Sequence, residues 1–395
     1  MNRCVLIINV GSTSVKTCLF DVDLQTKAVI NADYGSDAGL VIEGTTIQGN
    51  VVSRHDNSTH DINAALTVVL EIWRQTIAEN NVLLFAIGHR IVHGGSGFKT
   101  IAALSQDVLN RIAELDNYAP LHNPLNLLGV IMAGKIFSDV AQYAVFDTAF
   151  HRSIPDYAGR YAIPDNMSDK VDFYRYGFHG ISCQHSVRTA SELLGVEPSG
   201  LNLIILHLGG GASISAVRAG VSIDTSMGFS PTEGLIMATR CGDLDPMIAI
   251  TLQREGRSIE QLDQLLSHKS GLLGICGDAD MRVILQKAEQ GDATAKLAID
   301  MFCYRVRKYI GAYCAVLEDV DALIFTGGIG EHAPLIRHKI LQGLNKLGLM
   351  IDPEANQRQT NINNDISHQD SHARILVIHA EEEREIARLV LSLPA

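Results

Sequence analysis

The sequence has few charged residues and few aromatic residues, and it lacks a long hydrophobic run. Charged residues make up 19% of the 395 residues and aromatic residues 6%, whereas an average domain is about 25% charged. Hydrophobic residues reach 46%, which excludes an intrinsically disordered chain. No apolar run approaches the roughly 18 residues of a membrane span, and the run at 5–8 is too short for a signal-peptide core. We therefore expect a globular, cytoplasmic protein without a membrane partner.

The cysteines and the charge balance exclude two further classes. None of the seven cysteines forms a CxxC pair, and an odd, scattered set is typical of free thiols in a reducing compartment. Acidic residues outnumber basic ones by 44 to 32, which gives a net charge of −12. Because general nucleic-acid affinity comes from neutralising phosphates, we expect no nucleic-acid partner. An anionic ligand would need a local site where backbone N–H groups and a few cations converge.

Two common nucleotide-binding motifs are absent as well. Neither GxxxxGK[ST] nor GxGxxG after a strand occurs, which disfavours a P-loop NTPase and an ordinary dinucleotide-binding fold. Three glycine loops follow apolar runs instead, at 11–14, 209–213 and 327–330, and we predict that they are hairpins. Their backbone N–H groups can approach phosphate closely, and Lys16, on the same strand face as Ser14, could reach the same phosphate. One such loop is weak evidence, but three favour phosphate binding.

Short apolar runs alternate with helical patterns along the chain. Continuous hydrophobicity in such runs is typical of strands buried on both faces, so we predict an α/β architecture. One helix is predicted from Asp61, its N-cap, and another from Asp292 to about residue 317. A third closes the chain. The predicted strands are 4–11, 82–90, 142–150, 201–211, 321–331 and 373–381. The apolar stripes contain Ile62, Leu66, Val69, Trp73 and Ile77 in the first helix, and Leu297, Met301 and Val306 in the second.

The chain contains a weak internal repeat. Segments 5–23 and 203–224 both read as an apolar strand, a polar residue, glycine with small residues, and a second apolar strand. Asn9 and His207 occupy matching places, half a chain length apart. Because such hairpins are common, the pattern fits either coincidence or two homologous halves that each offer a hairpin to one ligand. The turn-rich segment 150–200 is expected to form loops and short strands, with the domain boundary near its start.

Candidate functional residues follow the predicted strands, where α/β proteins place their sites. Arg90 and Arg240 lie in turns rich in Gly or Pro, and their planar guanidinium groups suit a phosphoryl group in transfer. A structural ion pair is the alternative for both arginines. Asp147 ends a buried-looking strand and should have a cation, metal or hydroxyl partner, although a helix N-cap is also compatible.

The histidines point to function less directly. His89 and His93 have i, i+4 spacing, but the intervening Ile and Val and the following glycines indicate a strand and a turn. We therefore expect structural roles for them rather than a zinc site. For His122, His179 and His207, a hydrogen-bonded structural histidine is the default, and His179 is the strongest functional candidate.

Taken together, the motifs resemble the acetate and propionate kinase family over essentially the whole chain. The resemblance implies two duplicated actin/Hsp70-like (ribonuclease H-like) α/β domains with an interdomain cleft, and a homodimer. It implies an acyl-side domain of residues 1–150 with a returning helix at 382–395, and a nucleotide-side domain of residues 151–381. The matching stretches are NVGSTSVK, GHRIVHGG, APLHNP, FDTAFH, YRYGFHG, HLGGGAS, DTSMGFSPTEGLIMATRCGDLDP, SGLLGICG and FTGGIGE.

The same resemblance implies the site residues. The catalytic groups would be Asp147, Arg90, Arg240 and His179, with His179, Arg240 and His122 acting at the transition state. The acyl group would contact Arg90, Val92, Leu121, Phe178 and Pro231. Asn9 and Glu382 would hold the metal. The nucleotide and its phosphates would contact Asn9, Ser12, Ser14, Lys16, His207, Gly209, Gly210, Gly211, Asp280, Arg282, Gly327, Gly328, Gly330 and His332.

The implied reaction is reversible phosphoryl transfer from ATP to acetate, giving acetyl phosphate and ADP, with Mg²⁺ or Mn²⁺. Propionate is the close competitor, because one methylene is worth only about 1–3 kcal/mol of discrimination; the size of Val92 favours acetate. An actin- or Hsp70-like nucleotide-gated binding protein is a less favoured alternative, because no peptide-binding domain is left over. A sugar kinase is a third alternative, but the expected acyl pocket is apolar and cationic.

Overall fold

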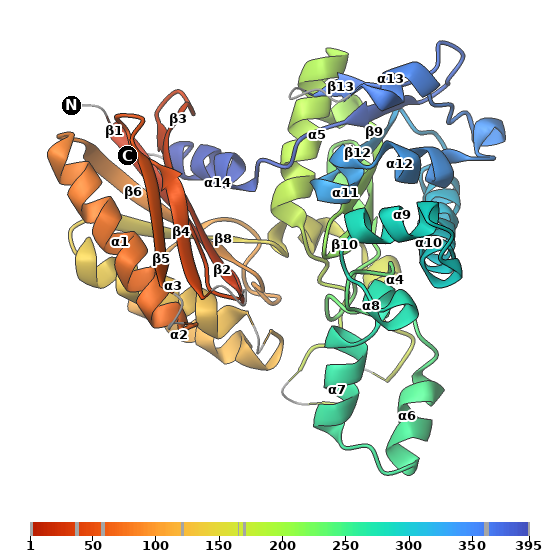
Figure 1. Cartoon of the computed structure of the whole chain (residues 1–395), viewed down its shortest axis with the longest axis horizontal. Coiled ribbons are helices and arrows are strands. Elements are labelled where there is room, and N and C mark those ends of the chain that lie inside the picture. The colour runs from red at the N-terminus through yellow and green to blue at the C-terminus, as the bar shows by residue number, and fades with distance from the viewer. Residues whose placement is uncertain are drawn as a thin grey trace. The chain divides into compact units, whose positions relative to one another are not determined.

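The computed structural model describes residues 3–35, 39–56, 60–119, 122–164, 166–168, 171–358 and 363–393. The chain divides into two compact units, Met1–Ala149 with Glu381–Ala395, and Phe150–Ala380. In Figure 1 the C-terminal helix, in blue, lies beside the red and orange strands of the first unit. None of the helices in the described ranges is both long and apolar enough to cross a membrane.

The first unit contains a mixed sheet in the order β5-β4-β3-β2-β1-β6-β8-β7. Strands β1, β6 and β8 are parallel, whereas β2 to β5 are joined to β1 by successive antiparallel pairings. The strands are β1 Arg3–Val10, β2 Ser14–Asp21, β3 Thr26–Asp33, β4 Leu40–Thr45, β5 Val51–Asp56, β6 Leu83–Ile91, β7 Ala102–Ala103 and β8 Ala141–Phe146. The helices are α1 Ile62–Glu79, α2 Gln106–Ala113, α3 Asn123–Ile136 and α14 Glu382–Leu391, with a 3-10 turn at Glu114–Asn117.

Strand β1 is buried on both faces, as its continuous hydrophobicity predicts. Leu6 and Ile8 belong to the core formed with α1 and α3, and the strand alternation turns Ile7 to the other face. Helix α14 covers that second face. A Cβ on Gly88 of β6 would lie only 2.8 Å from Ile386 of α14. The absence of a side chain at Gly88 therefore allows the last helix to pack onto the sheet.

The second unit contains a sheet in the order β11-β10-β9-β12-β14-β13. Helix α5 packs on one face through Cys183, Val187 and Ala190, and α10 contacts β9 and β10. The strands are β9 Asn202–Leu208, β10 Ala212–Arg218, β11 Val221–Thr225, β12 Ala322–Thr326, β13 Asn364–Asp365 and β14 Arg374–Val377. The helices are α4 Asp156–Gly159, α5 Gly180–Leu194, α6 Pro246–Arg254, α7 Ile259–His268, α8 Gly271–Cys276, α9 Met281–Glu289, α10 Ala293–Leu317, α11 Gly327–His332, α12 Pro334–Leu341 and α13 Pro353–Gln357. The 3-10 turns are Ala149–Ser153, Pro198–Gly200 and Asn345–Leu347.

The two sheets share one central topology. The order β3-β2-β1-β6-β8 in the first unit matches β11-β10-β9-β12-β14 in the second. In both units three parallel strands are extended by two antiparallel ones. Asn9 and His207 lie on the corresponding strands β1 and β9, near the ends that lead into the glycine hairpins. The internal repeat in the sequence therefore corresponds to a duplicated α/β fold.

Most of the predicted elements are present. Each of the six apolar runs contains a strand, and Asp61 and Asp292 are the N-caps of α1 and α10. In α1, the side chains of Leu66, Val69 and Trp73 are fully buried, as predicted.

Three sequence predictions are wrong. Leu297 and Met301 are 53% and 39% exposed, because the buried face of α10 runs instead through residues such as Ala298, Phe302 and Val306. Segment 150–200 contains helix α5. This helix was missed because polar side chains such as His185 and Ser186 stand on its buried face. The loop at 327–330 is not a hairpin, since α11 begins at Gly327 directly after β12.

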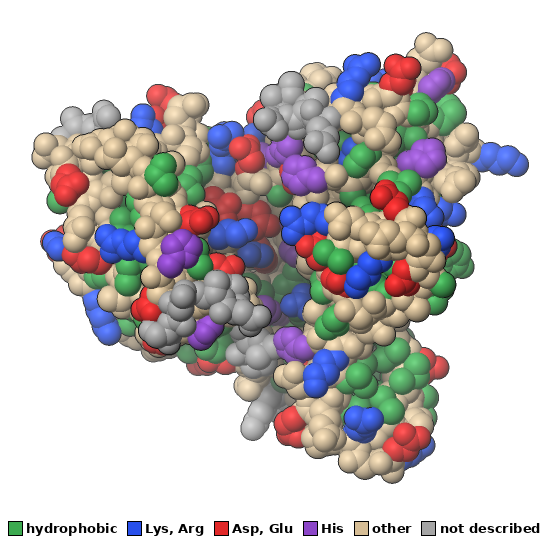
Figure 2. Space-filling model, in the orientation of Figure 1, with side chains coloured by type: hydrophobic (Ala, Val, Ile, Leu, Met, Phe, Trp, Pro, Cys, Tyr) green, Lys and Arg blue, Asp and Glu red, His purple; other side chains and the backbone are tan. Residues whose placement is uncertain are grey.

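Charged side chains of both signs are interspersed over the visible face of each unit (Figure 2). In this view neither unit carries a broad surface of one sign. On this face the acidic side chains are therefore not gathered in one patch.

The buried His89 makes the stability of the first unit dependent on pH. His89 is 1% exposed and its Nε2 lies 2.6 Å from Gln142 Oε1, and burial lowers the pKa of His89 to about 4. An unfolded histidine has a pKa of roughly 6.5, so below that pH the unfolded state takes up a proton first. The stabilisation is complete above about pH 6.5 and is lost as the pH falls toward 4.

We therefore predict that His89→Gln reduces the acid sensitivity of the first unit. Trp73, the single tryptophan, is fully buried in this unit, so its fluorescence during urea unfolding reports the unit's stability. Between about pH 7.5 and pH 5, the native protein should lose roughly 2 kcal/mol more stability than the variant. Equal losses in the two proteins would contradict the assignment.

Candidate functional site

The first polar group lies in the first unit, at the carboxyl ends of the parallel strands β6 and β8. Arg90 is near the end of β6, and Asp147 directly follows β8. Arg90 Nη2 lies 2.5 Å from Asp147 Oδ2, and Arg90 Nε lies 3.1 Å from the same oxygen. Asp147 is 1% exposed, so its carboxylate depends on this cation for compensation. The predicted partner of Asp147 is therefore Arg90.

Asn9 and the first turn of α14 complete this group. Arg90 Nη1 donates to Asn9 Oδ1 over 3.3 Å, and Asn9 Nδ2 donates to Glu383 Oε1 over 3.1 Å. Arg90 Nε also lies 3.7 Å from Glu382 Oε2. A guanidinium has five N–H donors, so Arg90 keeps donors for a further ligand after the bonds to Asp147 and Asn9.

Burial and charge shift the pKa values in this group. Burial of Asp147 and the nearby Glu382 carboxylate raise the pKa of Asp147, and Arg90 acts in the opposite direction. Burial lowers the pKa of Arg90, but the Asp147 and Glu382 carboxylates outweigh it and raise the pKa overall. Arg90 therefore remains a cation at every physiological pH.

The oxygen donors of this group suit a hard divalent cation. Asn9, Asp147, Glu382 and Glu383 provide amide and carboxylate oxygens around one arginine, and the formal charge of the acidic side chains exceeds that of Arg90. Among the described residues, His, Cys, Asp and Glu side chains form no group of three or more arranged to enclose a metal ion. Mg²⁺ commonly binds through one or two carboxylates and fills its shell with water and phosphate. The donor set thus fits Mg²⁺ bound together with a phosphate ligand.

The first glycine hairpin joins β1 to β2. Gly11 N donates to Ser14 O over 2.8 Å and closes the turn, and Ser12 and Lys16 are exposed. Lys16 pairs with Asn9 across the two strands, so a cation stands beside the polar group just described. His122 precedes α3 in the same unit, whereas Leu121 lies outside the described residues.

The second polar group lies in the second unit, around the hairpin between β9 and β10. The rings of His179 and His207 are stacked with centroids 4.1 Å apart. His179 Nδ1 lies 3.0 Å from Ser213 Oγ, and His207 Nδ1 lies 2.8 Å from Ser182 Oγ. The two serines fix both rings. The Nε2 atom of each ring lies next to the glycine hairpin. A Cβ added to Gly209 would lie 3.9 Å from His207 Nε2, and a Cβ added to Gly211 would lie 3.3 Å from His179 Nε2.

Arg240 reaches the same hairpin. Its Nη1 would lie 3.8 Å from a Cβ on Gly211, so the Arg240 and His179 side chains converge there. Burial lowers the pKa of Arg240, and its guanidinium makes no ion pair within the described ranges. A half-buried cation without a carboxylate partner, beside a glycine hairpin and a histidine, is an anion-binding arrangement.

A pocket of about 520 Å³ is lined in part by this hairpin. It lies between the hairpin, the start of α9 and helix α11, and its volume is within the usual range for small-molecule sites. Asp280, the N-cap of α9, forms an ion pair with Arg282 at 2.6 Å. The lining residues are Gly209, Gly210, Ala279, Asp280, Met281, Arg282, Leu285, Gly328, Ile329, His332 and Ala333.

Several of the predicted nucleotide contacts line this pocket, but others do not. Gly209, Gly210, Asp280, Arg282, Gly328 and His332 line it, whereas His207, Gly211, Gly327 and Gly330 do not. Sequence reasoning missed the apolar wall, including Met281, Leu285 and Ile329. Met281 and Leu285 have i, i+4 spacing directly after the N-cap Asp280, which is the signal that could have revealed them.

The residues expected around the acyl group belong to different units. Val92 follows β6 in the first unit, and its N–H donates to Asn126 Oδ1. Phe178, 2% exposed, and Pro231 belong to the second unit. The structural roles predicted for His89 and His93 agree with their contacts. Both side chains are buried, His89 lies against Gln142, and His93 Nδ1 accepts from Gly95 N.

Comparison with known proteins gives one family. The sequence model of the acetokinase family matches residues 4–388. An acetate kinase of Streptomyces avermitilis is 43% identical over 392 residues, which cover 98% of this chain and 97% of the relative.

Solved structures agree with the sequence match. A propionate kinase from Francisella tularensis subsp. tularensis has a TM-score of 0.90 at 38% identity and covers 98% of both chains. A Porphyromonas gingivalis acetate kinase has a TM-score of 0.89 at 34% identity, with the same coverage. The likeness extends over nearly the whole sequence and the whole fold, and the chain therefore belongs to the acetokinase family.

Proposed function

We propose that this protein is an acetate kinase, which transfers the γ-phosphoryl group of ATP reversibly to acetate. The observation that carries the proposal is the arrangement at the second hairpin. There, His179 converges beside Gly211 with Arg240, a cation that has no carboxylate partner among the described residues, and Gly209 and Gly210 of the same hairpin line a pocket of about 520 Å³. A cationic phosphate site and a nucleotide-sized pocket thus share one loop.

The pocket would take the base and ribose of the nucleotide. Met281, Leu285 and Ile329 provide an apolar wall for a flat ring, and Asp280 and His332 offer polar atoms at its rim. Backbone N–H groups of the glycine hairpin would then meet the phosphates, since glycine allows close approach. The second unit is accordingly the proposed nucleotide side.

His179 and Arg240 would act on the phosphoryl group in transfer. A carboxylate oxygen of acetate forms a bond to Pγ while the bond from Pγ to the bridging oxygen breaks, and that electron pair leaves with ADP. Because acetate is already an anion, no base has to remove a proton. Charge spreads over the phosphoryl oxygens in the transition state, where a fixed guanidinium and an imidazole N–H stabilise it.

The polar group of the first unit would serve the metal and the acyl group. Asn9 and Glu382 would hold Mg²⁺, or Mn²⁺ in its place; when bound, the ion offsets the phosphate charge. Ser12, Ser14 and Lys16 would contact phosphate, and the remaining donors of Arg90 would bind the acetate carboxylate. Val92, Leu121, Phe178 and Pro231 would surround its methyl group. A cleft shared by the two units, a cytoplasmic location and a homodimer stay predictions from the family.

Propionate kinase is the second candidate. The observation that favours it is the high structural similarity to the Francisella propionate kinase. We retain acetate because the 43% identical relative is an acetate kinase, and because a valine at position 92 leaves less room than a smaller residue.

The test is a hydroxamate assay with Mg-ATP and a panel of acceptors. We expect acyl phosphate from acetate, a lower kcat/KM with propionate by about 10-fold or more, and none with sugars. A higher kcat/KM for propionate would replace acetate kinase by propionate kinase. ATP hydrolysis without any acyl phosphate would instead favour a nucleotide-gated binding protein.

We predict that Arg240→Ala lowers kcat at least about 100-fold while the protein stays folded, because the transition-state charge loses its cation. The melting temperature and the ADP affinity provide the checks on folding and on the pocket. Arg254→Ala, at an exposed position in α6, is the matched control and should keep full activity. Near-normal turnover of Arg240→Ala would refute its assigned role.

We also predict that Gly211→Ala lowers kcat by about 10- to 100-fold. The added methyl group would meet His179 Nε2 at 3.3 Å, a tight contact, and would touch Arg240 Nη1 at 3.8 Å. It would therefore push His179 aside and occupy space between the two groups that must hold the phosphoryl oxygens. In the control Gly311→Ala, in helix α10, the added Cβ meets nothing within 4 Å, and activity should not change. Equal activities of the two variants would contradict the convergence of His179 and Arg240 on Gly211.

A further inference from the structure

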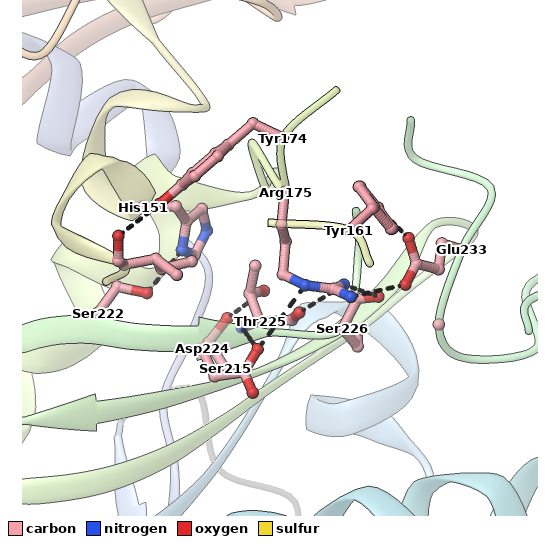
Figure 3. Close-up of polar contacts among 12 residues, drawn as sticks. His151, Tyr161, Tyr174, Arg175, Ser215, Ser222, Asp224, Thr225, Ser226 and Glu233 are labelled. Carbon is pink, nitrogen blue, oxygen red and sulfur yellow. Dashed lines mark hydrogen bonds and ion pairs between the residues drawn. The ribbon is translucent and has the colours of Figure 1, made fainter. Parts of the chain in front are cut away.

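A half-buried arginine lies four residues before His179. Arg175 Nη1 donates to Thr225 O over 3.1 Å and lies 3.4 Å from Ser226 O. Arg175 Nη2 donates to Glu233 Oε1 over 2.8 Å. Figure 3 shows the Arg175 side chain between Glu233 and the end of β11, where Thr225 and Ser226 lie. One guanidinium thus joins the segment that leads to His179 to the segment that leads to Pro231 and Arg240.

Glu233 is held from a second side. The Tyr161 hydroxyl donates to Glu233 Oε2, and it accepts from Phe229 N over 2.8 Å. A Cβ on Gly228 would lie 2.0 Å from the Tyr161 hydroxyl oxygen, so the contact requires glycine at this position. Glu233 therefore has a fixed place two residues after Pro231.

Backbone hydrogen bonds join the same two segments. Tyr176 N and Gly177 N donate to Gly228 O over 3.2 and 3.3 Å. Further along the loop, Ala238 N donates to Gly210 O over 3.0 Å, two residues before Arg240. The loop 226–243 is thus bound at one end to the His179 segment and, near its other end, to the glycine hairpin.

His179 itself depends on this support. Its backbone has φ 59° and ψ 26°, a left-handed conformation that costs a non-glycine residue about 1–3 kcal/mol. His151 Nε2 lies 3.0 Å from Phe178 O, and His151 Nδ1 lies 2.9 Å from Ser222 Oγ on β11. Figure 3 shows His151 and Ser222 near one end of β11 and Arg175 near the other. Strand β11 is therefore the common support of both segments.

The Arg175–Glu233 pair is more than a surface ion pair. The two side chains are 18% and 30% exposed, and Asp224 Oδ1 lies 3.9 Å from Arg175 Nε. Half-buried pairs contribute little net stability because desolvation offsets the attraction. Their geometry, however, is well defined, because the planar guanidinium binds its acceptors in fixed directions. Such a pair suits positioning better than stabilisation.

We propose that Arg175 is a positioning residue, which through Glu233 and the end of β11 sets the loop 226–243 so that Arg240 and Pro231 stand in register with His179. This inference rests on the proposed function, since it concerns the phosphoryl and acyl groups of that reaction. No residue of the loop 226–243 lines the nucleotide pocket, whose walls are formed by α9, α11 and the hairpin, so we expect Arg175 to affect ADP affinity far less than turnover.

The test compares Arg175→Met, Arg175→Lys and Glu233→Gln with the control Arg160→Met. Arg160 lies in the same unit, and it is 54% exposed in an ion pair with Asp156 at 3.1 Å. We expect Arg175→Met to lower kcat by about 10- to 100-fold and to raise KM for acetate, while the Kd for ADP stays within about twofold. Arg175→Lys should recover part of the loss, because it keeps the charge but not the planar fork.

A double-mutant cycle separates positioning from general destabilisation. If the two residues act as one unit, Arg175→Met/Glu233→Gln should lose no more kcat than the worse single variant. Losses in kcat and ADP affinity that follow the melting temperature in parallel would show a purely structural role and overturn the proposal. Unchanged kinetics of Arg175→Met in an active enzyme would also overturn it. A native protein that forms no acyl phosphate would instead refute the proposed function.

Discussion

The parallel pairing of the central strands is the constraint on which both polar groups depend. In the first unit β1, β6 and β8 run in one direction, and in the second β9, β12 and β14 do the same. Carboxyl ends of parallel strands meet at one edge of a sheet, so Arg90 and Asp147, far apart in sequence, come within 2.5 Å. The same pairing places the β9–β10 hairpin beside α11, which begins directly after β12.

The duplicated fold carries two chemically different polar groups. In the first unit, Arg90 is bound by Asp147 and Asn9 and lies beside Glu382, so the group has an acidic character suited to a divalent cation. In the second unit, Arg240 has no such partner among the described residues, and the hairpin there is lined by histidines and glycines. The two units therefore share one strand order but present different functional groups, because the side chains that follow the strands differ. This division matches a reaction that joins an acyl anion to a nucleotide phosphate.

Local patterns predicted the fold well, and they failed where burial did not follow hydrophobicity. Asp61 and Asp292 were correct N-caps because capping depends on nearest neighbours. Helix α5 was missed because polar side chains occupy part of its buried face. Leu297 was misplaced because the buried face of α10 passes through Ala298 and Phe302 rather than through Leu297 and Met301. The glycines at 327–330 begin a helix rather than a hairpin. Strand β12 has parallel neighbours on both sides, β9 and β14, so the segment directly after β12 cannot fold back and pair with it.

The sequence by itself determined the strand and helix segments, the internal repeat and the residue types available for phosphate and carboxylate chemistry. Those features depend on periodicity and on short motifs, which involve neighbours in the chain. Only the tertiary structure decided that Arg90 is paired with Asp147, whereas Arg240 has no carboxylate partner in the part of the chain that the structure describes. It also decided that Met281 and Leu285 wall a pocket and that Arg175 holds Glu233. These contacts join segments that lie tens of residues apart in the sequence. The three-dimensional packing of the segments decides which polar groups meet, and short sequence motifs do not contain that information.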